Sequence, residues 1–414
     1  MHYGIVAIGS RGDVQPYVAL ALGLMDRGQE ATVMAHENFK DFVEGYAVKF
    51  LPLEGNVEDM LKSEEGLKVL KSGRIIAFAR YLQKTIRKTR ESVSQDLYNG
   101  CQKADVLVAS LLGMPWVDCI AEKSGKKWAI VQLNLPAIPT KAFPLAAMDF
   151  FNLPSYNLLT YRIFESFYWR SNKKGINDFR KSLGLPELKT PILKKISDEK
   201  IVNLHCFSAA LLSRPNDWQA HNDISGFLFL PTNIEKIQGN LNRWLGSGDK
   251  PIYIGFGSIP IPDPELIKSI ITELLRTTTH RFIFCLGWSL PINLTAHPRL
   301  FKVKSINHQW LFPRCKAAII HGGVGTTAAA LKAKIPLIII SIIADQPWWG
   351  KIIARKKLGV HIPFKKLSAQ KLISAIEKTQ GPQMQQNAVE MGVRINREDG
   401  LKQTIDALEK YFAG

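Results

Sequence analysis

The chain begins with a stretch that reads YGIVAIGSRGDVQPYVALALGLMDRGQEATVMA, residues 3–35. Its pattern predicts a strand, a polar turn, a helix and a second strand, in that order, at residues 3–8, 9–13, 16–27 and 31–35. Pro16 suits the first turn of a helix, where its missing N–H is harmless, and Gly28 ends the helical pattern. This βαβ unit favours a parallel, doubly wound α/β sheet.

The same alternation of short apolar runs and helical segments fills the rest of the chain. The first half adds a helix at 75–98 and strands at 48–53, 105–110, 128–133 and 201–207. The pattern then restarts, with strands at 251–256, 281–286, 317–320 and 336–340 and helices at 264–276 and 326–333. We expect a first domain at 1–225, a linker at 226–242 containing Pro231, Thr232 and Asn233, and a second domain at 243–391.

Composition limits the class of protein. The 414 residues have a formal charge of +18, which by itself suggests nucleic acid binding, although no RNP aromatics, zinc-finger spacing or helix-turn-helix pattern accompanies it. The hydrophobic fraction of 46% excludes general disorder. Five cysteines without a C-x-x-C spacing favour a reducing cytosol, and the N-terminus lacks the features of a signal peptide. These features predict a cytoplasmic protein.

Two α/β domains bind ligands beyond the carboxyl ends of their strands, so the loops after strands carry the chemistry. In the first such loop, Gly9-Ser10-Arg11-Gly12-Asp13, two glycines allow the backbone to approach a ligand. Asp13 could cap the helix or act as a general base that takes a proton from a hydroxyl. Arg11 could contact a phosphate, form a salt bridge or simply be exposed.

The second loop is His321-Gly322-Gly323-Val324-Gly325-Thr326-Thr327. Three glycines in four positions at the start of a helix predict a nest of backbone N–H groups that suits a pyrophosphate, although no G-K-[ST] follows as in a P-loop. His321 could donate to a phosphate oxygen or keep a hydrogen bond in the core.

The third loop is Ala344-Asp345-Gln346-Pro347. Adjacent Asp345 and Gln346 side chains suit a polyhydroxylated sugar. Asp345 could equally be the N-cap of the next helix, with Pro347 in its first turn.

Taken together and in order, these loops resemble the family 1 glycosyltransferases, in the subgroup of the sterol and lipid 3-β-glucosyltransferases, with the bacterial natural-product glycosyltransferases near it. The matching segments are 9–16 (GSRGDVQP), 139–144 (PTKAFP), 255–258 (GFGS), 308–313 (HQWLFP), 321–327 (HGGVGTT) and 345–349 (DQPWW). The resemblance implies the GT-B fold: two Rossmann-like domains facing across a cleft, with a C-terminal helix, 392–414, that packs back on the first domain.

The resemblance also implies the reaction and its residues. A sugar, with glucose the first choice, would pass from a UDP- or dTDP-sugar to a hydroxyl with inversion, and Asp13 would be the base. Donor binding would fall to Ser10, Gly12, Ser258, Ile306, His308, His321, Gly323, Gly325, Thr326, Asp345 and Gln346. Ser305 stands where plant enzymes carry a Trp that stacks on uracil, and Val324 where Ser or Ala is usual. The chain has no D-x-D pair, so we expect transfer without a metal or other cofactor.

The aromatic stretch 143–169 would line the acceptor pocket, with Phe143, Phe150 and Phe151 as binding residues; a plain core helix is the alternative. The implied acceptor is a hydrophobic alcohol such as a sterol, flavonoid or polyketide. The basic runs 84–90 and 173–174 could contact an anionic membrane or form a solvated face. A regulatory protein that binds a nucleotide sugar without transfer, and a dTDP-sugar enzyme of the antibiotic type, remain alternative functions.

Overall fold

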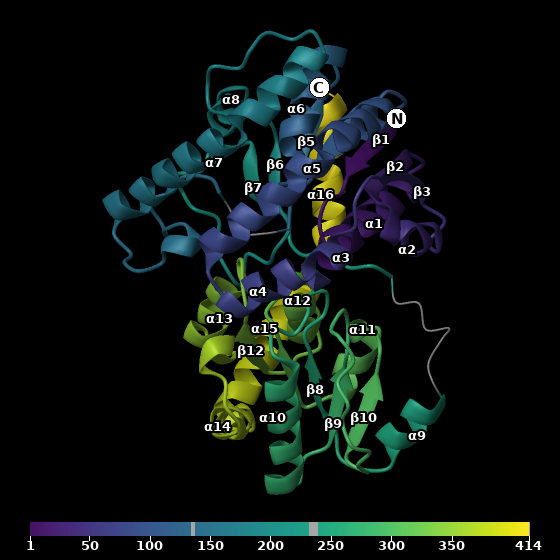
Figure 1. Cartoon of the computed structure of the whole chain (residues 1–414), viewed down its shortest axis with the longest axis vertical. Coiled ribbons are helices and arrows are strands. Elements are labelled where there is room, and N and C mark those ends of the chain that lie inside the picture. The colour runs from purple at the N-terminus through teal and green to yellow at the C-terminus, as the bar shows by residue number, and fades with distance from the viewer. Residues whose placement is uncertain (134–136, 232–238, 414) are drawn as a thin grey trace. The chain divides into compact units, whose positions relative to one another are not determined.

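A computed structural model describes residues 1–133, 137–231 and 239–413. The chain divides into two compact units (Figure 1). The first contains Met1–Val57, Arg80–Leu230 and Asp399–Gly414, and the second contains Glu58–Ala79 and Pro231–Glu398. Of the expected linker, residues 232–238 lie outside the described part of the chain.

The first unit is built on a seven-stranded parallel sheet of strand order β3-β2-β1-β4-β5-β6-β7. Its strands are β1 (His2–Val6), β2 (Glu30–His36), β3 (Lys49–Leu53), β4 (Val106–Ala109), β5 (Trp128–Gln132), β6 (Asn203–His205) and β7 (Asn222–Ile224). The central strands are apolar and almost wholly buried, as expected for a parallel sheet covered on both faces.

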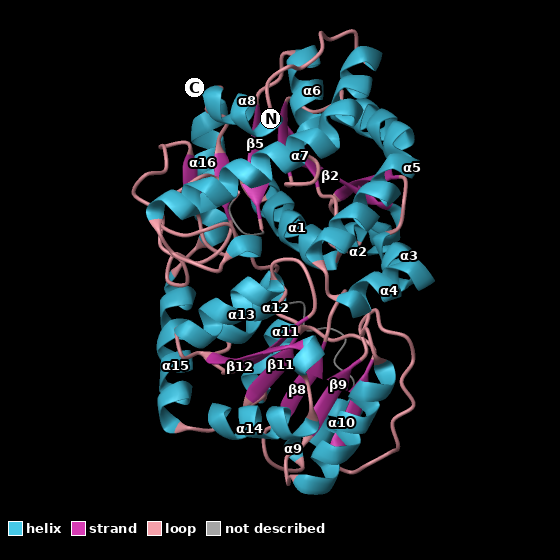
Figure 2. Ribbon diagram, turned by 60° about the vertical axis from the view of Figure 1, so that its left-hand side comes forward, coloured by secondary structure: helices cyan, strands magenta, loops and turns pink. Residues whose placement is uncertain are grey.

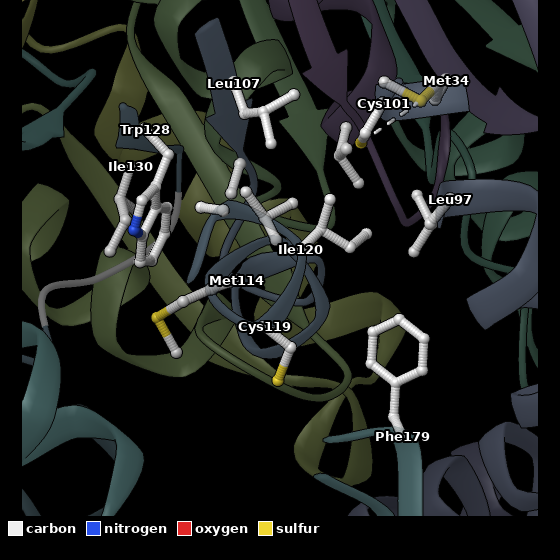
Figure 3. Close-up of a cluster of buried hydrophobic side chains, with 14 of the residues drawn as sticks. Met34, Leu97, Cys101, Leu107, Met114, Cys119, Ile120, Trp128, Ile130 and Phe179 are labelled. Atoms are coloured by element: carbon white, nitrogen blue, oxygen red, sulfur yellow. Dashed lines mark hydrogen bonds between the residues drawn. The ribbon is translucent and has the colours of Figure 1, made fainter. Parts of the chain in front are cut away.

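Helices cover both faces of this sheet. They are α1 (Arg11–Met25), α2 (Lys40–Glu44), α5 (Ile75–Cys101), α6 (Met114–Ser124), α7 (Pro154–Ser182), α8 (Ile192–Asp198) and α16 (Gly400–Ala413), α5 beginning within the second unit. On one face, Leu107 and Ile130 pack with Ile120 of α6 and Phe179 of α7 in a buried cluster (Figure 3). On the other face, the ring of Tyr3 contacts that of Phe412, at 5.7 Å between centroids.

The start of α1 differs from the prediction. The helix begins at Arg11, so Pro16 lies in its interior and not in its first turn, and part of the expected polar turn is helical. The backbone N–H and the hydroxyl of Ser10 both donate to the Asp13 carboxylate. These two bonds cap the helix and fix its start at Arg11. Pro16 is tolerated inside the helix although it removes one N–H donor.

The second unit has a six-stranded parallel sheet of order β10-β9-β8-β11-β12-β13 (Figure 2). Its strands are β8 (Ile252–Gly255), β9 (Phe282–Cys285), β10 (Leu300–Val303), β11 (Ala317–Ile320), β12 (Leu337–Ser341) and β13 (Gly359–Pro363). Its helices are α3 (Val57–Lys62), α4 (Glu64–Ser72), α9 (Gly239–Gly246), α10 (Pro264–Thr277), α11 (His308–Leu311), α12 (Val324–Lys332), α13 (Gln346–Arg355), α14 (Ala369–Thr379) and α15 (Pro382–Arg397).

The end of the chain forms two helices where one was expected. The last residues of α15 stay in the second unit, where the Asn396 side chain donates to the Lys332 carbonyl at 2.9 Å. From Asp399 onward the chain belongs to the first unit, where α16 packs along α1. Arg27 of α1 joins Asp406 and Glu409 of α16, both at 2.7 Å, and Ile405 fills the space beside Gly23.

Candidate functional site

The first group of site residues lies where β1 passes into α1. Both donors of Ser10 point at Oδ2 of Asp13: the backbone N–H at 2.7 Å and the hydroxyl at 3.0 Å. Gly9, at φ +145°, leaves room for this carboxylate, which a β-carbon at Gly9 would overlap. Oδ1 has no hydrogen-bond partner among the residues that the structure describes. Oδ2 of Asp13 therefore helps to cap the start of α1, as the capping hypothesis predicts. Oδ1 remains available to a ligand.

Asp13 lines a small pocket that holds about 250 Å³ of space, part of it open to solvent. The other lining residues are Ile8, Tyr17, Ser110, Leu111, Leu112 and Leu133. The Tyr17 hydroxyl donates to the Val131 carbonyl at 2.5 Å, so the phenol is already engaged. One carboxylate in a largely apolar pocket can accept a hydrogen bond from a hydroxyl carried by an apolar molecule.

The electrostatics of the pocket favour a base. Burial raises the pKa of Asp13 above its ordinary value, and the two hydrogen bonds from Ser10 only partly offset this. A carboxylate with a raised pKa is a stronger base than one in water, which suits proton transfer near neutral pH. Burial also raises the pKa of Tyr17 far above its ordinary value, so that this phenol stays neutral beside the carboxylate.

The second group lies in the second unit, at the carboxyl ends of β8, β11 and β12. Ile320 pairs with Gly255 on one side and with Ile339 on the other, which places the three following loops side by side. A β-carbon on Gly257 would lie 3.0 Å from Cε1 of His321. Gly322, at φ +93°, packs against Ile339 so closely that a β-carbon there would lie 2.7 Å from its Cγ2.

His321 sits at the centre of these loops. It is 7% exposed, its Nδ1 has no hydrogen-bond partner among the described residues, and burial lowers its pKa to about 4. The imidazole is therefore neutral near pH 7 and can donate one hydrogen bond without carrying charge. Ser258, in the turn after β8, is partly exposed on the same side of the sheet.

The amino end of α12 presents unused backbone donors. Gly323 is its N-cap residue and supplies no side chain to the first N–H groups of the helix. Gly325 is exposed, and a β-carbon there would meet nothing within 4 Å, while Thr326 is half-buried beside it. A nine-residue helix that begins with uncapped amides beside a neutral imidazole is a suitable site for a pyrophosphate.

The third loop brings Asp345 and Gln346 to the same edge. Asp345 is the N-cap residue of α13 but makes no side-chain cap, since its Oδ2 accepts from the Trp349 indole at 3.0 Å. Oε1 of Gln346 accepts from the N–H groups of Ile342 and Ile343, and its Nε2 has no partner among the described residues. Ala344 holds the left-handed conformation, φ +59°, that the turn requires.

Three further residues follow strands at this edge of the second sheet. His308 and Ile306 were predicted to bind the sugar donor, and Trp288 was not predicted. Nε2 of His308 is 2.9 Å from the Tyr253 hydroxyl, and its ring stacks on Phe312 at 4.7 Å, so packing occupies this histidine. Ile306 is partly exposed in the loop before it. Sequence reasoning missed Trp288, a half-buried indole after β9 whose backbone N–H donates to the Gly257 carbonyl at 3.0 Å. The pair Gly287-Trp288, two residues after the end of β9, would have indicated it.

Two family models match the chain: the glycosyltransferase family 28 N-terminal domain over residues 3–140, and the erythromycin biosynthesis protein CIII-like C-terminal domain over residues 292–398. Sterol 3-beta-glucosyltransferase UGT80B1 of Arabidopsis thaliana is 30% identical over 422 residues, which cover 99% of this chain and 68% of the relative. The chain belongs to the glycosyltransferase family of these sterol 3-beta-glucosyltransferases.

Other members of the family are longer than this chain. UGT80A2 of Arabidopsis thaliana is 32% identical over 100% of the chain and 66% of its own length, and the sterol 3-beta-glucosyltransferase of Neurospora crassa is 30% identical over 99% of the chain and 27% of its own length. The chain thus spans about two thirds of the plant glycosyltransferases that it matches and about a quarter of the fungal one.

Solved structures of glycosyltransferases share the fold. The kitacinnamycin glycosyltransferase superposes with a TM-score of 0.74 at 14% identity, covering 99% of this chain and 98% of its own. The calicheamicin glycosyltransferase CalG4 has a TM-score of 0.70 at 15% identity, with the same coverage. These likenesses concern the fold alone, and with the two parallel sheets they confirm the predicted GT-B architecture of two Rossmann-like domains.

The predicted acceptor residues do not gather at the Asp13 pocket. Phe143 is half-buried, and its carbonyl accepts from the Tyr161 hydroxyl at 3.2 Å. Phe150 and Phe151 are 77% and 65% exposed and line no part of that pocket. Arg11 lies on the surface with its guanidinium 4.6 Å from the centre of the Phe42 ring. Gly12 is exposed, and a β-carbon there would meet only Ser10 Oγ, at 3.8 Å.

Proposed function

We propose that the chain is an inverting glycosyltransferase that moves a sugar, glucose in the first instance, from a UDP-sugar to a hydroxyl of a hydrophobic small molecule. Asp13 is the general base. The observation that carries this proposal is the Asp13 carboxylate, which is fixed through one oxygen and bears its other oxygen in an apolar pocket. Membership of the sterol 3-beta-glucosyltransferase family supports the same reaction class.

The Asp13 pocket would bind the acceptor and activate its hydroxyl for attack on the sugar. Oδ1 of Asp13 takes the proton of the acceptor hydroxyl while the hydroxyl oxygen forms a bond to the anomeric carbon. Leu111, Leu112 and Leu133 line the pocket beside Asp13, where they can contact the part of the acceptor next to its hydroxyl. The hydrogen bonds from Ser10 keep the carboxylate from turning away.

On the donor side, the amino end of α12 accounts for the leaving group. As the bond from the anomeric carbon to the phosphate oxygen breaks, the nucleoside diphosphate gains negative charge. The backbone N–H groups of Gly325 and Thr326 and a hydrogen bond from neutral His321 stabilise that charge. Ser258 adds a hydroxyl donor from the neighbouring turn. In this proposal these groups serve where other enzymes use a cation, and no cofactor takes part.

The third loop accounts for sugar selection. The Nε2 group of Gln346 can donate to a sugar hydroxyl, because Oε1 of the same side chain is fixed by two backbone N–H groups. Asp345 can accept from the neighbouring hydroxyl while its Oδ2 remains on the Trp349 indole. A fixed donor beside a fixed acceptor suits two adjacent hydroxyls of a sugar.

Two alternatives remain: an enzyme that uses a dTDP-sugar donor, and a regulatory protein that binds a nucleotide sugar without transferring it. A dTDP-sugar donor remains an alternative, because the exposed Ser305 offers no aromatic surface that would fix the nucleotide base. The fold neighbour SsfS6 was solved with thymidine diphosphate, a likeness that at 15% identity extends to the fold alone. A regulatory protein that only binds a nucleotide sugar would need the donor loops but no base in an apolar pocket.

One experiment separates these possibilities. Purified protein is incubated with UDP-glucose, UDP-galactose or dTDP-glucose and with sterols, flavonoids or polyketides, and the products are identified by mass spectrometry and by the anomeric proton coupling. We expect a β-linked glucoside of a hydrophobic alcohol from UDP-glucose. Binding of UDP-glucose without any transfer across the panel would favour the regulatory protein instead.

A further inference from the structure

A histidine outside the three loops is bonded to the strand end from which the third loop departs. His361, on the edge strand β13, is half-buried, and its Nε2 lies 2.8 Å from Oγ of Ser341. Ser341 is the last residue of β12 and is only 4% exposed, and the loop that carries Asp345 and Gln346 starts directly after it. The bond therefore ties the end of β12 to the edge strand at the point where the chain leaves the sheet.

The same ring supports the helix at the other end of this loop. The helix α13 packs on β12 and β13, and a β-carbon at Gly350 would lie 2.5 Å from Cδ2 of His361. Glycine at this position lets the helix approach the imidazole closely. Burial lowers the pKa of His361 below its ordinary value, so the ring against the helix is neutral near pH 7. One side chain thus holds the loop 342–345 at both ends, through Ser341 before it and Gly350 after it.

The backbone around the loop needs this support for two reasons. Pro363 of β13 is in register with Ser341, and a proline has no N–H to donate to the ladder at this end of the strand pair. Within the loop, Ala344 has the left-handed φ of +59°, which a residue other than glycine keeps only where neighbouring contacts hold it. The Ser341–His361 bond supplies a side-chain tie where the backbone lacks one.

The tie reaches the amide that faces the proposed sugar site. The N–H groups of Ile342 and Ile343, the two residues after Ser341, donate to Oε1 of Gln346 at 2.8 and 3.2 Å. These two bonds orient the Gln346 amide and so decide where its Nε2 group points. A displacement of the end of β12 would move both N–H groups and turn the amide with them. The orientation of Gln346 therefore depends on the strand end that Ser341 anchors.

We propose that His361 is a positioning residue for the sugar of the nucleotide-sugar donor, and that it acts through Ser341 to hold the loop that presents Gln346. The inference rests on the proposed function, which assigns the sugar to this loop and the pyrophosphate to the amino end of α12. Because the two parts of the donor contact different loops, loss of the Ser341–His361 bond should weaken binding of a nucleotide sugar and spare binding of a nucleoside diphosphate.

The affinities for UDP-glucose and UDP, measured side by side, test this separation. His361→Phe keeps a ring against Gly350 and removes the hydrogen bond, and the smaller change Ser341→Ala removes the same bond should the first variant be unstable. Each should weaken UDP-glucose binding roughly fivefold in calorimetric titration, the range of one hydrogen bond, with UDP affinity within about twofold of the wild type. The double variant should bind UDP-glucose no more weakly than either single variant. His361→Gln, whose amide can still bond to the Ser341 hydroxyl, should restore most of the affinity.

His2→Phe is the matched control. Nε2 of His2 lies 2.7 Å from Oγ1 of Thr32, which is 3% exposed on the neighbouring strand β2, so this variant removes the same kind of bond in the other unit. It should leave both affinities unchanged, with circular dichroism unaltered in all variants. Equal weakening of UDP and UDP-glucose, or unchanged UDP-glucose affinity in His361→Phe and Ser341→Ala, would overturn the role of His361 alone. Wild-type protein that binds neither ligand would reject the proposed donor site and this inference with it.

Discussion

Ser10 gives both of its donors to one oxygen of Asp13, the N–H at 2.7 Å and the hydroxyl at 3.0 Å. This relationship fixes the carboxylate at the start of α1 and leaves Oδ1 for a ligand in the pocket. In the proposed function, the Asp13 side chain joins a structural role with the role of general base. Substitutions that remove one Ser10 donor or the Asp13 charge can separate the structural role from the proposed role as base.

Ser10→Ala removes the hydroxyl donor and should affect both roles. We expect the free energy of unfolding to fall by about 1 kcal/mol, as for other N-cap serines replaced by alanine. The Ser10 hydroxyl bond lowers the pKa of Asp13, so its loss should raise that pKa and move the acid limb of the kcat/KM profile to higher pH. Ser10→Thr, which keeps a hydroxyl, is the control. An acid limb at the wild-type position in Ser10→Ala would show that this bond does not tune the base.

Asp13→Asn should stabilise the folded protein near neutral pH. Because burial raises the pKa of Asp13 in the folded state, the folded protein binds this proton more tightly than the unfolded chain does. The charged carboxylate therefore destabilises the fold above its folded pKa, and the effect disappears as the pH falls below about 4, the ordinary aspartate value. Thermal unfolding from pH 8 to pH 4 should give a higher Tm for Asp13→Asn at the upper end and a shrinking difference. A lower Tm at pH 8 would contradict the raised pKa.

Gly325→Ala tests the anion site without disturbing the fold. The added methyl meets no protein atom within 4 Å, so the free energy of unfolding should stay the same or rise by about 0.5 kcal/mol. If the pyrophosphate lies against the amino end of α12, the methyl should reduce affinity for UDP at least tenfold, about 1.4 kcal/mol. Gly246→Ala in α9, also with no atom within 4 Å, is the matched control in calorimetric titration. Unchanged UDP affinity in Gly325→Ala would place the pyrophosphate elsewhere.

His321 should bind the donor as a neutral imidazole. Burial lowers its pKa to about 4, so its contribution to donor affinity should be constant from about pH 5.5 to pH 8. UDP-glucose is the right ligand, because the terminal phosphate of free UDP itself titrates near pH 6. His321→Ala should weaken UDP-glucose binding roughly tenfold, the range of a hydrogen bond to a charged group. A step near pH 6.5 in the wild type that His321→Ala abolishes would instead mean a charged imidazole.

The sequence supports prediction best where long apolar runs and glycine-rich turns coincide. The strands β1, β4, β5, β8, β11 and β12 and the three loops after strands were all visible in the pattern. The edge strands β7, β10 and β13 were missed, because polar, charged, glycine or proline positions interrupt them and they lack the continuous apolar run of the central strands.

The pocket around Asp13 shows what local pattern cannot reveal. Tyr17 and Ser110 line the pocket with Asp13, yet Ser110 is 97 positions along the chain from Asp13 (110 against 13), and only the pairing of β1 with β4 brings them together. Phe150 and Phe151, predicted from the aromatic stretch to bind the acceptor, lie exposed on the surface and do not line the Asp13 pocket, and their role in acceptor binding stays a prediction. His308 packs on Phe312 and Tyr253, and its predicted contact with the nucleotide stays a prediction.

The most direct measurement is the turnover of Asp13→Asn beside its affinity for UDP-glucose. Asparagine keeps the shape and can still accept from the Ser10 N–H, but it cannot take a proton from the acceptor. We predict that kcat falls by about 10²–10⁴ while the Kd for UDP-glucose, measured by calorimetry, stays within about twofold of the wild type. Turnover at the wild-type rate in Asp13→Asn would contradict the assignment of Asp13 as the base.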